Sequence, residues 1–269
     1  MVGLKKLLKK YLFERLPCQY RLAAERVYLY YYYGDAYVGR DVRIFKQLCD
    51  PCKVSLDIGA NWGLMTLFMS KYSHHVYSFE PVPWIYKDLS KKFHGANVSV
   101  FDCALGNTDG EFLISIPWIG NRRLETRSSL SKDFIDETIL GEQIARLDKV
   151  NVKVRRLDDL NITNVGFVKI DVEGFEMEVL EGGAHTIKEN MPNMVVEIES
   201  RHLRGKNIFQ TFKYLADLGY LGYFVYKNRL FEIQEFDGTL MQNTRDEKEK
   251  DLYVNNFIFS RLPQMGLQI

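Results

Sequence analysis

Hydrophobic and polar positions follow a repeating pattern from residue 54 onward, in which short apolar runs alternate with stretches of helical spacing. This alternation is typical of βαβ units, whose parallel strands form one buried sheet. The predicted strands are residues 54–58, 76–79, 98–101, 167–170, 194–198, 220–226 and 257–260. The pattern predicts an α/β fold, doubly wound, with a seven-stranded and mostly parallel sheet.

The intervening segments complete this picture. Helical spacing is predicted for residues 64–72 and 208–218. Between the third and fourth strands, residues 111–116 and 152–156 have β-type patterns around a polar stretch. We expect this insertion, at about residues 117–150, to form a lid or rim beside a functional site.

The first fifty residues differ from the rest of the chain. Between residues 4 and 16, leucine and tyrosine lie at helical spacing, while lysine and arginine fall largely at the other positions. This predicts a basic amphipathic helix that docks on the main domain, with peripheral contact to an anionic membrane surface as the alternative. We therefore divide the chain into an N-terminal helical extension (1–50), a main domain (51–262) and a tail (263–269).

Composition narrows the classes of partner and compartment. The 36 basic residues nearly balance 35 acidic ones, so net charge gives no reason to expect a nucleic-acid partner. Four cysteines are too few for a disulfide scaffold, and the pair Cys49 and Cys52 lacks the further ligands of a closed zinc site. With neither a membrane-spanning apolar run nor a signal-peptide block, we expect a cytoplasmic protein, or one peripheral at the inner membrane surface.

Residues 57–63 join the first predicted strand to the following helix. Gly59 and Gly63 permit a tight turn and close approach of a ligand. Their spacing differs from the dinucleotide fingerprint, and the carboxylate of Asp57 disfavours a pyrophosphate. This carboxylate suits a cationic or hydroxyl-bearing ligand, and S-adenosylmethionine offers a sulfonium, an ammonium and a ribose.

Two further acids follow the next strands. Glu80 ends the second predicted strand, where a carboxylate can accept hydrogen bonds from both ribose hydroxyls. Asp102 lies just past the third strand, where it can contact an adenine amino group, or else cap the following turn. We predict that these two acids, Asp57 and the two turn glycines bind the cofactor.

Several ordered sequence blocks resemble the FkbM-type methyltransferases, a branch of the class I S-adenosylmethionine-dependent enzymes. The blocks are residues 56–61, 79–83, 104–106, 128–130, 157–160, 168–174 with Glu176, and 196–198. They follow the family's order and cover about residues 54 to 260. The resemblance implies a seven-stranded class I fold, S-adenosylmethionine as cofactor, and O-methylation of a hydroxyl on a sugar or secondary metabolite.

The resemblance also carries over to individual residues. It supports Asn61, together with Asp57, Gly59 and Glu80, as cofactor-binding residues, and it makes the acids at 171 and 173 the leading candidates near the transferred methyl. Trp62 departs from the smaller aliphatic residue often found in the glycine turn. We expect this difference to reshape the pocket without abolishing binding.

Asp171 and Glu173 follow the fourth predicted strand, at the sheet edge where α/β proteins bind ligands, and alternation points them the same way. An alcohol acceptor must lose its proton to a base or to a metal-stabilised alkoxide. Either acid is a candidate base, and His202 after the fifth strand is another. Both acids could also hold a divalent cation such as magnesium with Glu197 or Glu199, but two acids do not complete a site, so no metal is expected.

The leading hypothesis is an S-adenosylmethionine-dependent O-methyltransferase acting on a sugar hydroxyl of a glycan or glycosylated metabolite. The expected partner is thus a small-molecule or glycan acceptor. Trp118, Arg122 and Arg123 in the insertion are candidates for contacting it, with a solvated loop as the alternative. A non-sugar metabolite as acceptor, a nucleotide-binding oxidoreductase and a non-catalytic cofactor-binding module remain alternative hypotheses.

Overall fold

The computed structural model of the 269-residue chain describes residues 43–123, 138–139, 142–203, 205–242, 252–263 and 266–269. The predicted basic helix near the N-terminus and the sequence block at 128–130 lie outside the described residues. Part of the predicted insertion also lies outside them.

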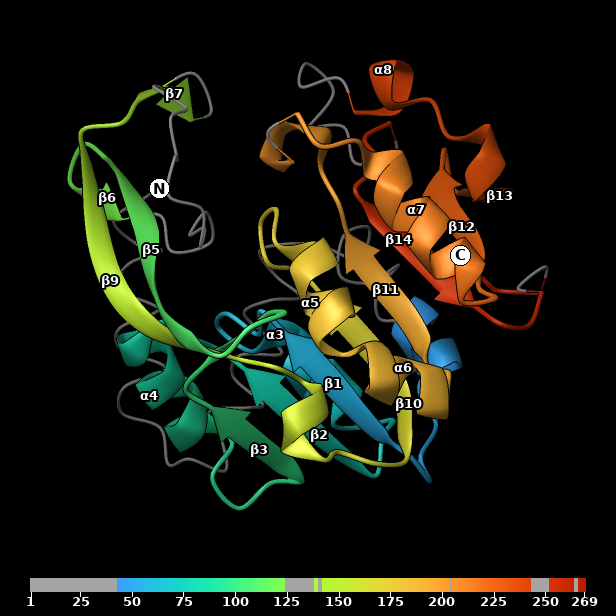
Figure 1. The fold of residues 1–269 in the computed structure, drawn as a ribbon, viewed down its shortest axis with the longest axis horizontal. Helices are drawn as coiled ribbons and strands as arrows, with labels where there is room; N and C mark the ends of the chain where they lie inside the picture. Colours follow the sequence, from blue (N-terminus) through green and yellow to red (C-terminus); the bar gives the residue numbers. More distant parts are fainter. Residues whose placement is uncertain (1–42, 124–137, 140–141, 204, 243–251, 264–265) are drawn as a thin grey trace, which may run out of the picture.

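An eight-stranded sheet forms the centre of the molecule, with the strand order β13-β12-β14-β11-β10-β1-β2-β3 (Figure 1). Its strands are β1 (Val54–Ile58), β2 (His75–Phe79), β3 (Val98–Phe101), β10 (Val165–Ile170), β11 (Asn193–Glu197), β12 (Leu221–Tyr226), β13 (Arg229–Glu232) and β14 (Asn256–Ser260). The strands from β3 to β11 are parallel, and β14, β12 and β13 pair antiparallel. The predicted α/β class and mostly parallel sheet are confirmed.

Helices cover both faces of this sheet, which explains why β1 and β10 are buried along their whole length. On one face lie the helical residues 43–48 with α3 (Leu64–Met69) and α4 (Pro83–Lys92). On the other lie α5 (Glu176–Gly182), α6 (Ala184–Asn190) and α7 (Ile208–Asp217). Shorter helical segments are η2 (Asp158–Leu160), η3 (Ser200–His202), η4 (Ile233–Glu235) and α8 (Gly238–Met241).

A long antiparallel arm replaces the simple connection between β3 and β10. It consists of β5 (Gly110–Ile119) and β9 (Arg146–Arg155), with the short strands β4 (Ala104–Leu105) and β6 (Arg122–Arg123) at its sides. A separate pair, β7 (Thr138–Ile139) and β8 (Glu142–Gln143), lies beyond. Ile114, Ile116 and Val154 pack against Val82 and Ile85 beside α4, so the arm is anchored to the main domain at its base. Of the predicted insertion, residues 117–119, 122–123 and 146–150 belong to the strands of this arm (Figure 1).

The hairpin of β12 and β13 adds a strand that the sequence analysis did not predict. Its two turn residues, Lys227 and Asn228, have φ angles of 49° and 57°. Two successive left-handed residues form the type I′ turn that suits a two-residue hairpin. The usual sequence signal for this turn is a glycine at the second position, and asparagine takes its place here.

The described C-terminal residues return to the helical segment at 43–48. Gln47 donates to the carbonyl of Gln268 at 2.9 Å, and the amide of Gln268 donates back to the Gln47 side chain at 2.9 Å. Leu267 and Ile269 pack against the same cluster as Phe45. Among the described helices, none has the length and apolar composition needed to cross a bilayer.

Candidate functional site

The predicted site residues meet at one edge of the sheet. Asp57, Glu80, Asp171 and Glu197 lie at or just past the ends of β1, β2, β10 and β11. Because these four strands are parallel neighbours, their carboxyl ends share an edge. Three loops and the short helix η3 then complete the surroundings.

The glycine turn brings two of these loops into contact. Gly59 has a φ of +82°, and its amide donates to the carbonyl of Phe79 at 3.1 Å. A Cβ atom at this position would lie 1.8 Å from the carbonyl oxygen of Asp171. Gly63, with φ +80°, precedes α3, and a Cβ there would lie 2.4 Å from Leu89. Gly59 is therefore required because a side chain there would overlap backbone, whereas at Gly63 the left-handed conformation and the side chains of Leu89 and Phe93 disfavour one.

Glu80 fixes this turn from the neighbouring strand. One carboxylate oxygen accepts from the amide of Asn61 and the other from the amide of Val82, both at 2.8 Å. Burial raises the pKa of Glu80 to about 7, although these hydrogen bonds oppose the shift. Asn61 has a φ of 50°, and its side-chain oxygen accepts from the amide of Trp62 at 2.8 Å. Both predicted cofactor residues thus shape the turn itself.

Asp57 lies beneath the turn with no exposed surface. Oδ2 accepts from the hydroxyl of Thr66 in α3 at 2.5 Å, and Oδ1 lies 4.0 Å from the ammonium of Lys169. Burial raises the pKa of Asp57, and the charge of Lys169 and the Thr66 hydroxyl counteract that rise. The side chain therefore influences the site by its charge and by holding α3 against β1.

Lys169 is a site residue that the sequence analysis missed. Its buried ammonium lies 2.9 Å from Oδ2 of Asp171, in addition to its contact with Asp57. Burial lowers the pKa of Lys169, but the charges of Asp171 and Asp57 outweigh that effect, so the pKa is raised and the ammonium persists. A lysine inside an otherwise apolar strand, two residues before an acid, was the available signal.

Glu173 and His202 form a second pair at this edge. Oε2 of Glu173 lies 2.9 Å from Nδ1 of His202. Burial lowers the pKa of His202, but the hydrogen bond and the charge of Glu173 outweigh it, and the pKa is raised. A Cβ at Gly174, whose φ is +97°, would lie 2.5 Å from the carbonyl oxygen of His202. The two residues, considered separately in the sequence, therefore form one bonded unit.

Two further carboxylates lie at the end of β11. Oε1 of Glu197 accepts from Asn255 at 2.7 Å, and Oε2 of Glu199 accepts from the hydroxyl of Tyr253 at 2.7 Å. Arg201 lies 2.6 Å from the same Glu199 oxygen. Burial, reinforced by the charges of Asp171 and Glu173, raises the pKa of Glu197 well above its usual range. Sequence patterns gave no signal for Tyr253 and Asn255, because they come from a distant loop.

The acids of this edge do not converge into a metal site. Within the described ranges, no group of three or more histidine, cysteine or acidic residues is arranged to hold a metal ion. Asp171 pairs instead with Lys169, and Glu173 with His202. The divalent-cation alternative thus receives no geometric support from these residues.

Cys49 accepts a hydrogen bond from Ser55 at 3.9 Å, and burial raises its thiol pKa to about 11.

The remaining predicted residues lie toward the arm. Asp102 is more than half exposed and forms an ion pair of 3.1 Å with Lys153 of β9, so its contact with adenine stays a prediction. Trp118 donates from Nε1 to Asp148 at 2.8 Å, and the guanidinium of Arg146 lies 4.3 Å from its ring centroid. Arg122 and Arg123 form β6, which pairs with the end of β5; their side chains lie outside the described residues.

Several known proteins are similar to this chain. Methyltransferase 1 of Beauveria bassiana (strain ARSEF 2860) is 31% identical over 157 residues, covering 53% of this chain and 63% of that protein. Methyltransferase sdnD of Sordaria araneosa is 29% identical over 169 residues, covering 53% and 64%. The chain therefore spans just under two thirds of the length of these curated relatives. The crystal structure of methyltransferase FkbM from Methylobacillus flagellatus KT is 14% identical, with a TM-score of 0.49, and the match covers 80% of this chain and 47% of that one.

The family comparison covers the site described above. The model of the methyltransferase FkbM domain matches residues 57–221, which is more than half of the chain. The matched range begins at Asp57 and includes Glu80, Lys169 and the pair of Glu173 with His202. The chain therefore belongs to the FkbM methyltransferase domain family.

Proposed function

We propose that the protein is an S-adenosylmethionine-dependent O-methyltransferase that acts on a sugar hydroxyl of a glycan or glycosylated metabolite. The observation that carries the proposal is one buried cation, Lys169, which lies 4.0 Å from the carboxylate of Asp57 beneath the glycine turn and 2.9 Å from that of the partly exposed Asp171. The bonded pair of Glu173 and His202 lies at the same edge. Family membership supports methyl transfer, and the oxygen acceptor and the sugar are what this proposal adds.

The residues of the glycine turn fit S-adenosylmethionine. Because Gly59 has no side chain, the carbonyl of Asp171 packs directly against the turn, which brings the loops after β1 and β10 together at the sheet edge where α/β proteins bind ligands. Glu80 retains lone pairs for ribose hydroxyls beside its two backbone donors. The charge of Asp57 favours a sulfonium over a phosphate. When bound, S-adenosylmethionine supplies an activated methyl group.

His202 and Glu173 are suited to remove the acceptor proton. Because Nδ1 of His202 bonds to Glu173, the ring presents Nε2 as the nitrogen that accepts a proton from a hydroxyl. Glu173 fixes this tautomer and stabilises the imidazolium that forms, as a carboxylate does in a catalytic triad. The contact between His202 and Glu173 supports the proposal that His202 is the general base and Glu173 its orienting acid.

Asp171 has a different role in this proposal. Lys169 holds its carboxylate in place at 2.9 Å, and the side chain remains about 30% exposed at the edge. A sugar carries hydroxyls next to the one that reacts, and a fixed carboxylate accepts a hydrogen bond from such a neighbour. Asp171 therefore positions the acceptor, and positioning contributes much of the rate in a displacement at carbon.

Calorimetry with S-adenosylmethionine tests the first step. We expect binding of this ligand and none of a nicotinamide dinucleotide; the reverse result contradicts the proposal and favours the oxidoreductase alternative.

Methyl transfer from labelled S-adenosylmethionine to a panel of glycosides and non-sugar alcohols tests the second step. We expect His202→Gln and Asp171→Asn to lose most of the turnover, whereas Asp217→Asn, which alters an exposed ion pair on α7, keeps it. Transfer only to non-sugar alcohols would replace the sugar by another metabolite, and equal turnover in all variants would remove both residues from the mechanism.

A further inference from the structure

The general base of the proposed mechanism lies on a segment that is too short to hold itself in place. η3 is a single 3₁₀ turn of three residues, and none of the three is buried. Its N-cap residue, Glu199, makes no side-chain capping bond. One helical turn fixes more backbone angles than its hydrogen bonds offset, so an isolated turn is not stable. Contacts from outside η3 must therefore set the position of His202.

The acid that meets His202 is fixed by its own loop. Glu173 has a left-handed backbone conformation, with a φ of 54°. The next amide, that of Gly174, donates to Oε1 of the buried Glu176 at 2.8 Å, which closes the loop after β10. The contact of 2.9 Å between Glu173 and His202 thus depends on how η3 is placed against this loop.

Gln242, the C-cap residue of α8, makes four hydrogen bonds around η3. Its Oε1 accepts from the amide and the hydroxyl of Ser200, at 2.8 Å and 2.7 Å. Its Nε2 donates to the carbonyls of Ile198 and Val254, at 2.7 Å and 2.9 Å. A primary amide has two donor hydrogens and an oxygen with two lone pairs, so these bonds use its whole capacity. The side chain therefore joins η3 to the end of β11 and to the segment before β14.

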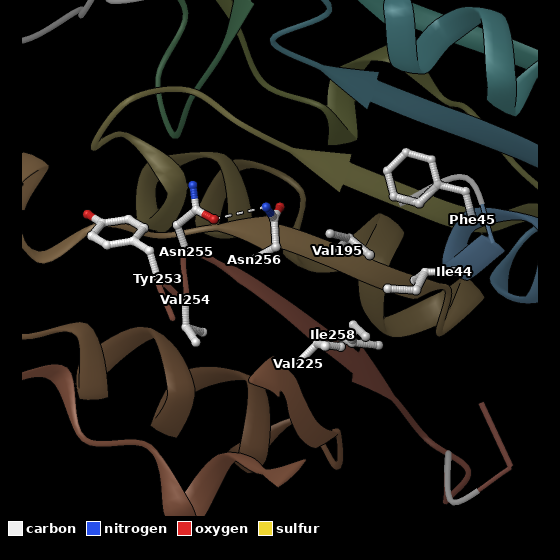
Figure 2. Close-up of a pocket in the computed structure, with 9 residues that line it drawn as sticks. All are labelled: Ile44, Phe45, Val195, Val225, Tyr253, Val254, Asn255, Asn256 and Ile258. Carbon is white, nitrogen blue, oxygen red and sulfur yellow. Dashed lines mark hydrogen bonds between the residues drawn. The ribbon is translucent and has the colours of Figure 1, made fainter. Parts of the chain in front are cut away.

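Gln242 is itself anchored to the core. The amide of Val254 donates to the carbonyl of Met241 at 2.8 Å, and both of these side chains belong to the main apolar cluster. Figure 2 shows Asn255 on the opposite side of the same segment from Val254, and there it donates to Glu197 at 2.7 Å. The segment before β14 thus links the core, the carboxylate edge and Gln242.

We propose that Gln242 is a positioning residue, which holds η3 so that Nδ1 of His202 meets Glu173. The inference rests on the proposed function and deepens it, because it adds a residue that acts on the reaction only through another side chain. None of the four bonds of Gln242 goes to His202 or Glu173. Its effect on the rate comes from geometry, since a displacement of about 1 Å at a reacting group can cost about a hundredfold.

The titration of His202 tests the positioning without cofactor or acceptor. NMR follows the imidazole ring in the whole chain, and its signal is assigned by its absence from His202→Gln. The charges that act on this ring are those of Glu173, Glu199 and Arg201. In Gln242→Met the four bonds are lost, so the contact with Glu173 weakens and the pKa of His202 should fall. A pKa equal to that of the unaltered protein overturns the proposal.

Kinetics test whether this contact matters for methyl transfer. Gln242→Met should lower kcat by about tenfold or more, with an unchanged affinity for S-adenosylmethionine. In a His202→Gln background, the same change should alter the residual kcat by less than about twofold, because no base remains to be positioned. An equal loss in both backgrounds overturns the proposal. A lowered pKa together with full turnover in His202→Gln would support the positioning and contradict the proposed function.

Two matched variants complete the comparison. Gln210→Met makes the same chemical change at an exposed position of α7 and should leave the His202 pKa and kcat unchanged. Ser200→Ala removes only the bond from the hydroxyl, at an exposed position, so it should lower the His202 pKa by less than Gln242→Met does. Thermal melting shows which variants fold. If Gln242→Met does not fold, an unchanged His202 pKa in Ser200→Ala overturns the proposal.

Discussion

The bond between Glu173 and His202 sets the protonation of the base in the proposed mechanism. A histidine accepts a proton only when it is neutral. Because the pKa of His202 is raised, the ring becomes neutral only at a pH above the ordinary histidine pKa of about 6.5. The rate of methyl transfer should therefore increase as the pH rises through this elevated pKa.

Glu173→Gln is predicted to shift this increase to lower pH. Without the carboxylate, burial remains and lowers the His202 pKa, while the loss of orientation reduces the plateau rate by about tenfold or more. The pH profile of kcat measures both effects. Glu181→Gln, at an exposed acid bonded to Asn107, serves as the control. A profile with an unchanged midpoint would contradict the role assigned to Glu173.

In the proposed mechanism, the ammonium of Lys169 holds together Asp57 on the cofactor side and Asp171 on the acceptor side. Its replacement by methionine keeps the size of the side chain but leaves Asp57 and Asp171 without their cation. Removing one partner of a buried ion pair costs about 3–5 kcal/mol of stability. We expect a loss of about 3 kcal/mol in the free energy of unfolding, together with weaker S-adenosylmethionine binding.

Urea denaturation and calorimetry measure these two effects of Lys169→Met. Lys213→Met removes an exposed ion pair with Asp217 and should change stability by less than about 0.5 kcal/mol. If both variants lost the same free energy of unfolding, the ion pairs of Lys169 would contribute no more to stability than an exposed ion pair does.

The glycine turn is the element whose shape the sequence predicted best. Gly59→Ala combines a left-handed conformation with a contact of 1.8 Å to backbone, whereas Gly95→Ala has a similar φ, +78°, and nothing within 4 Å. The second change should cost about 1–2 kcal/mol for conformation alone. The first should cost clearly more and abolish cofactor binding. If urea denaturation showed equal losses of unfolding free energy in the two variants, the loops at Gly59 and Asp171 would move apart at little cost.

Local pattern predicted the parallel strands well, because strands buried on both faces are continuous apolar runs with little ambiguity. β3 has the predicted bounds, and β10 extends the prediction by two residues. The pattern failed where pairing depends on turn geometry, as at Lys227 and Asn228. It also underestimated the arm, whose strands continue past Ile116 and begin before Val152 because each pairs with the other.

At the scale of the whole molecule, the glycine turn and the outer part of the arm lie in different places. Figure 1 shows β5 and β9 extending away from the central sheet. Because we predict that Trp118 in this arm contacts the acceptor, a change there should affect acceptor binding and leave cofactor binding unchanged. Trp118→Ala is expected to raise the acceptor KM several-fold with an unchanged affinity for S-adenosylmethionine. Leu147→Ala, at an exposed position of β9, is the control. Weaker cofactor binding in Trp118→Ala would contradict the assignment of Trp118 to the acceptor.

Tertiary assembly explains which site residues escaped prediction. Asp57, Glu80 and Asp171 could be predicted because each follows a recognisable strand. Tyr253 and Asn255 come from a segment that the chain reaches only after β12, and their importance depends on contacts with Glu197 and Glu199. No local pattern encodes such a contact.

Among the described strands, β14 comes last in the sequence, yet it lies between two earlier strands, β11 and β12. During synthesis on the ribosome, the edges of β11 and β12 that pair with β14 therefore stay unpaired until residues 256–260 emerge. Exposed edges of this kind invite association with other chains. A nascent or prematurely terminated polypeptide would thus hold a formed glycine turn while remaining prone to aggregation.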